Sequence, residues 1–125
     1  MASRVLVVED DEKSRRLLVD VLAHHGFEVD AVETGEQGVE SSRRQQPDAV
    51  LLDIQLPGIS GFEVLRMLRQ IAAGRPLPIV AVTASVMDQD RTKIMEAGFD
   101  AYVAKPVNIR ELLQTLRSLL GGCEP

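Results

Sequence analysis

Polar side chains that could take part in chemistry follow four short apolar runs of this sequence. Two acids follow the run 5–8, a third acid follows 49–52, a hydroxyl follows 79–82, and an ammonium group follows 101–104. These side chains are those of Glu9, Asp10, Asp53, Thr83 and Lys105. A carboxylate in apolar surroundings is costly unless a cation meets it. Because the carboxyl ends of parallel strands share one edge of a sheet, where open α/β sheets bind ligands, we expect these groups to converge on a cation site.

The length and charge of the chain limit its organisation and its partners. A chain of 125 residues is expected to fold as one domain. Its formal charge of −5 argues against non-specific binding to nucleic acid or anionic membranes, and favours a protein or a cation as the partner. No apolar run approaches the roughly 20 residues that span a bilayer, and the N-terminus lacks a signal-peptide core, so we expect a cytoplasmic location. Cys123 has no second thiol with which to form a disulfide.

Helical periodicity between the apolar runs predicts an α/β fold. One helix is expected between the acidic cluster and Gly26, others begin near 35, 61 and 109, and a weaker one covers 88–97. Capping residues stand three positions before Gln or Glu in the pairs Thr34 and Gln37, Ser60 and Glu63, and Asn108 and Glu111. With an alternating strand over 28–32, five strands alternate with five helices. Right-handed crossovers then predict a doubly wound, five-stranded parallel sheet with helices on both faces.

The apolar stripes of these helices indicate how they pack. The first helix is expected to bury a stripe formed by Leu17, Leu18, Val21 and Leu22. The helix over 88–97 offers little apolar surface, so we expect it to be the most mobile one. Asp11 falls where the first helix begins, and we interpret it as a residue that faces the helix dipole or solvent rather than a metal ligand.

The order of these motifs resembles the receiver domain of two-component response regulators. An acid pair is followed by Asp53 with Leu-Pro-Gly at 56–58, then by Thr83, and then by Lys105-Pro106. The resemblance covers about residues 4–120 of a single domain over 1–125, and leaves 121–125 as a short tail. It implies a flavodoxin-like fold of the (βα)5 type.

The resemblance also implies a phosphoryl-transfer site. Asp53 would be the phosphoacceptor, and it would attack a phosphohistidine to form an acyl phosphate. Thr83 and Lys105 would contact the phosphate. Mg²⁺ would be held through hard oxygen ligands from Glu9, Asp10, Asp53 and the backbone carbonyl of Gln55. The Lys105–Pro106 peptide bond would be cis.

The same resemblance implies a conformational switch. Thr83 would move towards the phosphoryl group, and Tyr102 would rotate into the space that this movement leaves. The surface that responds would comprise the helix over 88–97, the strand over 101–104 and the helix from 109. Gln55 and Ser85 flank the path of a hydrolytic water, so we expect them to tune dephosphorylation.

Several functions are compatible with this reading. The favoured one is a phosphorylation-activated signalling switch, not an enzyme, that takes its phosphoryl group from a histidine kinase or a histidine phosphotransfer protein and signals through protein contacts. It would act as a monomer or weak dimer, either alone or as a receiver excised from a hybrid histidine kinase. A Mg²⁺-dependent phosphohydrolase with an aspartyl nucleophile would usually carry a second acid at the position of Gln55. A flavin-binding domain would need a Ser/Thr/Gly-rich phosphate loop after the first strand, and the sequence has none there.

Overall fold

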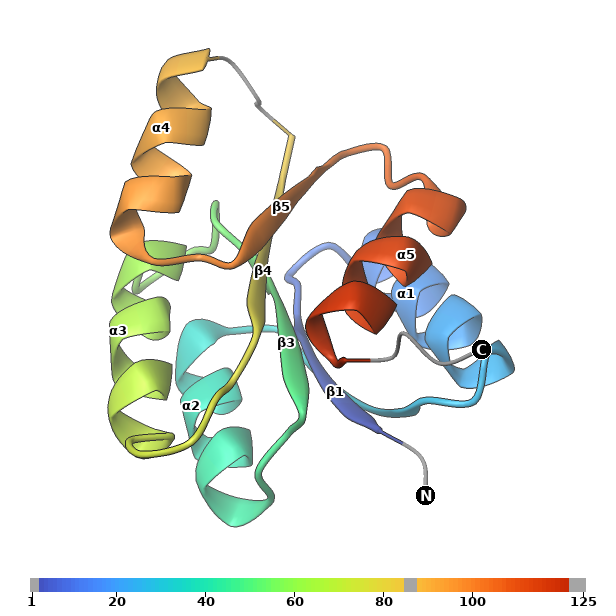
Figure 1. Cartoon of the computed structure of the whole chain (residues 1–125), viewed down its shortest axis with the longest axis horizontal. Coiled ribbons are helices and arrows are strands. Elements are labelled where there is room, and N and C mark those ends of the chain that lie inside the picture. Colours follow the sequence, from blue (N-terminus) through green and yellow to red (C-terminus); the bar gives the residue numbers. More distant parts are fainter. Residues whose placement is uncertain (1–2, 85–87, 122–125) are drawn as a thin grey trace.

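The computed structural model of the protein describes residues 3–84 and 88–121. Within these residues, strands and helices alternate along the chain (Figure 1). The elements are β1 (Arg4–Val8), α1 (Glu12–His24), β2 (Glu28–Val32), α2 (Gly35–Arg44), β3 (Ala49–Asp53), α3 (Gly61–Ile71), β4 (Ile79–Thr83), α4 (Asp88–Ala97), β5 (Ala101–Ala104) and α5 (Ile109–Leu119). Ser85 and Cys123 lie outside the described residues.

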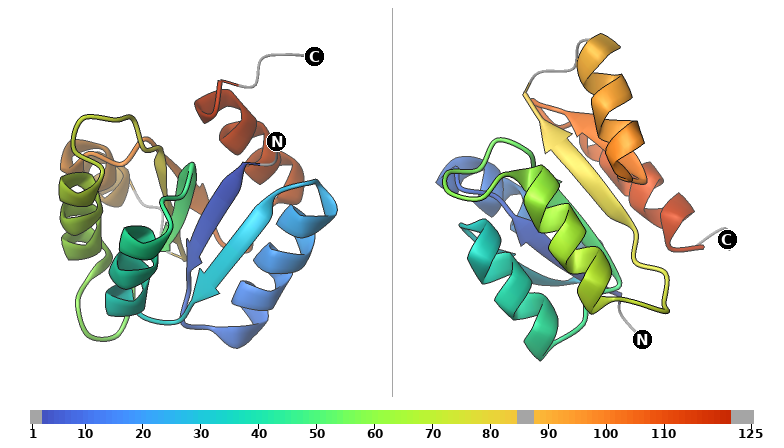
Figure 2. Two further views of the ribbon diagram at one scale, coloured as in Figure 1. Left: turned by 90° about the horizontal axis from the view of Figure 1, so that it is seen from below. Right: turned by 90° about the vertical axis from the view of Figure 1, so that its left-hand side faces the viewer.

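The five strands form one parallel sheet in the order β2-β1-β3-β4-β5. Helices α1 and α5 cover one face of the sheet, and α2, α3 and α4 cover the other (Figure 1). The two further views show the sheet between these helix layers (Figure 2). The predicted doubly wound α/β fold is therefore confirmed, and the carboxyl ends of all five strands meet along one edge.

The core consists of two apolar clusters, one on each face of the sheet. Along β3, Val50 and Leu52 belong to the cluster under α2, α3 and α4, whereas Ala49 and Leu51 belong to the cluster under α1 and α5. Because both faces are covered, β3 is buried along its whole length. This explains why its sequence is apolar up to Asp53 and does not alternate with polar residues.

Local hydrogen bonds fix the starts of the predicted helices. At Thr34, both bonds of a capping box with Gln37 form. The side chains of Ser60 and Asn108 each accept a hydrogen bond from the backbone three residues later, at 3.3 Å and 3.0 Å. The expected starts of α2, α3 and α5 are confirmed, and the bounds of α4 agree with the expected range.

The predicted stripe of α1 is wrong at one position. Leu18 and Leu22 are buried, but Leu17 is 45% exposed. Leu18 and Leu22 are four residues apart and share one helix face, whereas each step of one residue rotates the side chain by about 100°. Position 17 therefore turns away from the sheet. None of the helices in the described ranges is both long enough and apolar enough to span a membrane.

Candidate functional site

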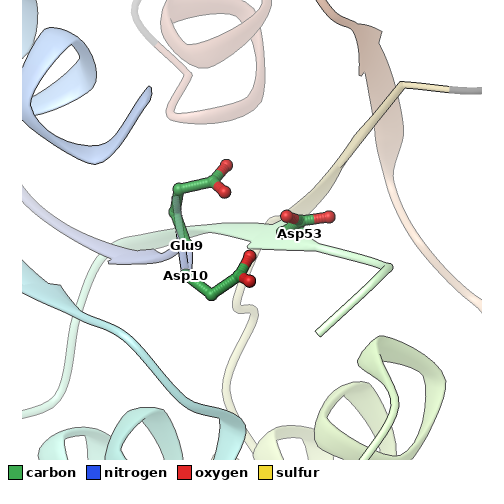
Figure 3. Close-up of side chains that lie close together, drawn as sticks. All are labelled: Glu9, Asp10 and Asp53. Carbon is green, nitrogen blue, oxygen red and sulfur yellow. The ribbon is translucent and has the colours of Figure 1, made fainter. Parts of the chain in front are cut away.

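The ends of β1 and β3 bring three carboxylates together. Glu9 and Asp10 follow β1, and Asp53 ends the adjacent strand β3 (Figure 3). One oxygen from each side chain lies within 4.8 Å of the others. Glu9 and Asp53 are buried, with 1% and 4% exposure, whereas Asp10 is open to solvent. The convergence predicted from the strand ends is confirmed for these acids.

Lys105 brings a positive charge to this cluster from the end of β5. Its Nζ lies 2.9 Å from Oε1 of Glu9 and 3.2 Å from Oδ2 of Asp53. A single ammonium group therefore contacts both buried carboxylates. Since Asp10 adds a third carboxylate, this cluster carries more negative than positive charge. The peptide bond between Lys105 and Pro106 is cis, as the resemblance implies.

Backbone amides hold the two buried carboxylates in place. The Gln55 N–H donates to Oδ1 of Asp53 at 2.9 Å, and the Asp11 N–H donates to Oε2 of Glu9 at 3.1 Å. The other Glu9 oxygen, Oε1, is close to Lys105 but accepts no aligned hydrogen bond from the described residues. A buried carboxylate oxygen with incomplete hydrogen bonding is a site where a cation is favourable.

Burial and charge shift the ionisation of two residues in the cluster. Burial raises the pKa of the Glu9 carboxyl above its ordinary value, and this effect outweighs the opposing contacts with Lys105 and the Asp11 amide. For Lys105, burial alone would lower the pKa of the ammonium group, but the contacts with Glu9 and Asp53 outweigh it and raise the pKa. Lys105 is therefore charged at neutral pH, whereas the charge on Glu9 is unfavourable while no further cation is bound.

The residues at this edge fit Mg²⁺. They supply hard carboxylate oxygens close together, one buried oxygen lacks an aligned donor, and the exposed Asp10 leaves room for bound waters. Mg²⁺ prefers such oxygen ligands and usually retains several waters. The backbone of Gln55, which contributes its N–H to Asp53, lies directly beside the cluster.

The loop after Asp53 is tightly packed because of Gly61. A Cβ atom at this position would lie 2.7 Å from Cα of Ile54 and 2.9 Å from the carbonyl oxygen of Asp53. The Gly61 N–H donates to the Ile54 carbonyl at 3.2 Å. Helix α3 therefore begins directly against the strand end that carries Asp53, and a larger residue would displace that strand end.

Thr83 and Tyr102 lie on the neighbouring strands β4 and β5. Thr83 is buried at the end of β4, and its carbonyl accepts a hydrogen bond from the Lys105 N–H at 2.8 Å. Tyr102 is half-buried, and the guanidinium carbon of Arg91 in α4 lies 5.5 Å from the centre of its ring. This cation–π contact joins α4 to β5 at the residue for which the resemblance implies a switch.

Asp11 caps a helix and does not belong to the carboxylate cluster. Its side chain accepts a hydrogen bond from the Ser14 N–H at 2.9 Å, at the start of α1. The hydrogen bonds with Ser14 lower the pKa of the Asp11 carboxyl. The interpretation of Asp11 as a residue at the helix start is confirmed.

Sequence reasoning missed two arginines near the site, Arg15 and Arg91. The guanidinium of Arg15 donates to the backbone carbonyl of Glu9 at 3.0 Å. Arg15 stands six residues after Glu9 and five after Asp10, near the start of α1, which was an available signal. Arg91 gave no comparable signal, because its contact with Tyr102 depends on how α4 packs against β5.

Comparisons with known proteins agree with this geometry. Residues 5–117 match the family model described as the response regulator receiver domain. The polar-differentiation response regulator DivK of Brucella ovis is 36% identical over 121 residues, which cover 97% of this chain and 98% of that protein. A CheY-like receiver domain protein from Methanospirillum hungatei JF-1 superposes with a TM-score of 0.88 at 29% identity, over 98% of this chain and 96% of the other.

A second solved structure is similar to this chain and contains a metal. The receiver domain of a sensor histidine kinase from Pseudomonas aeruginosa PAO1 is 35% identical, with a TM-score of 0.87, over 97% of this chain and 99% of that one. That structure has a magnesium ion coordinated in its active-site cleft. From its fold, its acidic strand edge and these matches, the chain belongs to the response regulator receiver domain family, whose members are phosphorylation-activated signalling switches of two-component systems.

Proposed function

We propose that Asp53 is the residue at which this switch is phosphorylated. The observation that supports it is the position of Asp53 at the carboxyl end of the central strand β3, within 3.2 Å of the Lys105 ammonium and beside the acids that follow β1. One carboxylate oxygen accepts the Gln55 N–H and the other contacts Lys105. These two contacts hold the Asp53 carboxylate in one orientation, close to the exposed Asp10.

The transfer step moves one phosphoryl group between two side chains. A carboxylate oxygen of Asp53 attacks the phosphorus atom of a phosphohistidine on a kinase or phosphotransfer protein. The new O–P bond forms as the P–N bond breaks, and the histidine nitrogen keeps the electron pair of that bond. The donor ring leaves protonated on its other nitrogen, with a proton taken up from solvent, so that the products are an acyl phosphate on Asp53 and a free imidazole on the donor. The charges that flank the phosphoryl group must be neutralised for this step.

The residues around Asp53 supply that neutralisation in different ways. Glu9, Asp10, Asp53 and the carbonyl of Gln55 would hold Mg²⁺, which would supply positive charge to offset that of the phosphoryl group. Lys105 already lies against Asp53, so a small shift lets its ammonium group contact the new phosphate. The Thr83 hydroxyl, at the end of the next strand, donates to another phosphate oxygen.

Tyr102 would carry the signal from the site to the surface. Phosphorylation draws Thr83 towards Asp53, and Tyr102 on the adjoining strand then rotates inward. This rearrangement changes the surface of α4, β5 and α5, through which the domain contacts its downstream protein. Gln55, which is exposed beside Asp53, sets the rate of hydrolysis together with Ser85, a residue outside the described ranges.

Mass spectrometry tests the phosphorylation site directly. The protein is incubated with a small-molecule phosphodonor and Mg²⁺, and its intact mass should increase by one phosphoryl group. Asp53→Asn is expected to gain no mass, whereas Asp48→Asn, an exposed acid before β3, should behave as wild type. Phosphorylation of Asp53→Asn to the wild-type extent would refute the assignment.

The switch can be followed in the same samples. Tyr102 is the single tyrosine of a chain without tryptophan, so intrinsic emission under tyrosine excitation reports on this residue alone. We expect the emission to change on phosphorylation of the wild type, and to stay constant in Asp53→Asn. An unchanged emission in fully phosphorylated protein would refute the role of Tyr102 while leaving that of Asp53 intact.

A further inference from the structure

Arg15 turns its guanidinium back towards the acidic strand end, unlike its neighbour Arg16. The side chain of Arg15 is 17% exposed, and that of Arg16 is 77% exposed. Nη1 of Arg15 lies 3.0 Å from the carbonyl oxygen of Glu9 and 3.5 Å from that of Asp10. Nη2 lies 3.7 Å from Oε2 of Glu33, which follows β2. The guanidinium thus bridges the backbone of the acid pair and the connection between β2 and α2.

The chain leaves the sheet where Arg15 makes these contacts. The paired register of β1 and β2 ends at Val8 and Val32, and the Glu9 N–H still donates to the Val32 carbonyl at 3.0 Å. Beyond this hydrogen bond, the segments that follow β1 and β2 are joined by the side chain of Arg15, which contacts the Asp10 carbonyl and the Glu33 carboxylate. The planar guanidinium presents several N–H groups in fixed directions and suits two adjacent carbonyls, whereas a lysine ammonium is a single point charge.

We propose that Arg15 is a positioning residue for the cation site, an inference that rests on the proposed role of Glu9 and Asp10 as metal ligands. The Glu9 carboxylate is held independently of Arg15, because it accepts a hydrogen bond from the Asp11 N–H and contacts Lys105. Asp10 is exposed, so the direction of its carboxylate depends on the orientation of its backbone. Arg15 sets that orientation through the carbonyls of the two peptide units that flank the Asp10 Cα.

Loss of the Arg15 charge and loss of its positioning role should change the affinity for Mg²⁺ in opposite directions. A guanidinium next to a cation site repels the cation, so a variant that lost only this charge would bind Mg²⁺ more tightly. A variant that lost the orientation of the ligands would bind Mg²⁺ more weakly, because groups that orient metal ligands commonly contribute tenfold or more to affinity. The sign of the change therefore separates the two roles.

Calorimetric titration of the full chain with Mg²⁺ provides the test. We expect Arg15→Met to weaken Mg²⁺ binding about tenfold. Arg16→Met removes the same charge from the next residue of the same helix, and we expect it to change the affinity less than about twofold, since exposed charges are screened. Arg15→Lys keeps the charge but loses the planar group, and should weaken binding by a smaller factor than Arg15→Met.

Phosphorylation kinetics add a readout that a general loss of stability would not reproduce. With a small phosphodonor, Arg15→Met should need about tenfold more Mg²⁺ for half-maximal rate, yet approach the wild-type rate at saturating Mg²⁺. Wild-type or tighter Mg²⁺ affinity in Arg15→Met would overturn the proposal. If circular dichroism shows that Arg15→Met does not fold, Arg15→Lys decides, and unchanged affinity in that variant overturns it. Absence of Mg²⁺ binding in the wild type would instead overturn the proposed metal site itself.

Discussion

Two charged clusters lie at opposite ends of the same sheet and differ in how far their charges are matched. At the carboxyl ends of the strands, one ammonium group of Lys105 faces the buried carboxylates of Glu9 and Asp53, with Asp10 close by. The pKa of Glu9 is raised, because burial of its charge is not fully compensated. This end of the sheet therefore favours the arrival of another cation.

At the amino ends of the strands, Arg69 and Asp100 form a matched cluster. Arg69 donates to the carbonyls of Leu77 and Gly98 and to Oδ2 of Asp100, the last at 2.9 Å. The same carboxylate oxygen accepts the Ile79 N–H at 2.8 Å. Here one cation meets one anion and the remaining contacts are neutral, so the cluster joins α3, β4 and the end of α4 without excess charge.

The difference shows that an ion pair alone does not mark a functional site. Both clusters contain short ion pairs between residues distant in sequence. Buried carboxylates in excess over cations distinguish the carboxyl end, and such an excess costs stability unless a ligand relieves it. Four experiments test the two clusters and then the contact between Arg91 and Tyr102, from the largest expected effect to the smallest.

Mg²⁺ binding should depend on one end of the sheet alone. We expect Asp10→Asn to lose measurable Mg²⁺ binding in calorimetry, because the variant removes a charged oxygen ligand. Asp100→Asn removes an equal charge from the other cluster and should retain wild-type affinity. Equal losses in the two variants would show that overall charge, and not the local cluster, governs binding.

The free energy of unfolding should depend on the cluster of Arg69 and Asp100. Arg69→Met removes the guanidinium that satisfies two backbone carbonyls and Asp100, and we expect it to lower the free energy of unfolding by about 1–3 kcal/mol. Urea denaturation measures this change. The exposed Arg66→Met, on the same helix, should cost less than about 0.5 kcal/mol. A variant at 69 that is as stable as the variant at 66 would contradict the structural role of this cluster.

The carboxylate cluster at the carboxyl ends of the strands should make the free energy of unfolding depend on pH. The folded pKa of Glu9 lies above the ordinary value of 4.5, so the folded state binds more protons than the unfolded state between these two values. Without metal, the stability of the wild type relative to Glu9→Gln should therefore fall as the pH rises from 4.5, and become constant above the folded pKa. Urea denaturation in EDTA over a pH series measures this difference. A constant difference would mean that Lys105 compensates the burial of Glu9 completely, and a difference that grows with rising pH would mean that the folded pKa of Glu9 is lowered instead.

The smallest effect is expected at the contact between Arg91 and Tyr102. A partly exposed cation–π pair contributes about 0.5–1 kcal/mol. A double-mutant cycle with Arg91→Gln and Tyr102→Leu should give a coupling free energy of this size in urea denaturation. The matched cycle with Lys93→Gln, on the same helix, should give a value near zero. Coupling that is equal in the two cycles would indicate a general charge effect of α4.

Local signals in the sequence were sufficient for the strands, the helix starts and the main acidic site. The capping pair at Thr34 and Gln37 and the apolar run that ends at Asp53 act through neighbouring residues. Both can be recognised in the sequence before the packing of the elements is known. Once the strands were taken as parallel, their carboxyl ends had to meet at one edge, and this placed Glu9, Asp10, Asp53 and Lys105 together.

Tertiary packing decided the features that the sequence left open or mispredicted. The exposure of Leu17 depends on the rotation of α1 against the sheet, and the need for glycine at 61 depends on the distance between α3 and the end of β3. The contacts of Arg15 with the acid pair and of Arg91 with Tyr102 depend on side-chain directions between separate elements. Long side chains of the same type have several rotamers, and only the packed neighbours select one of them.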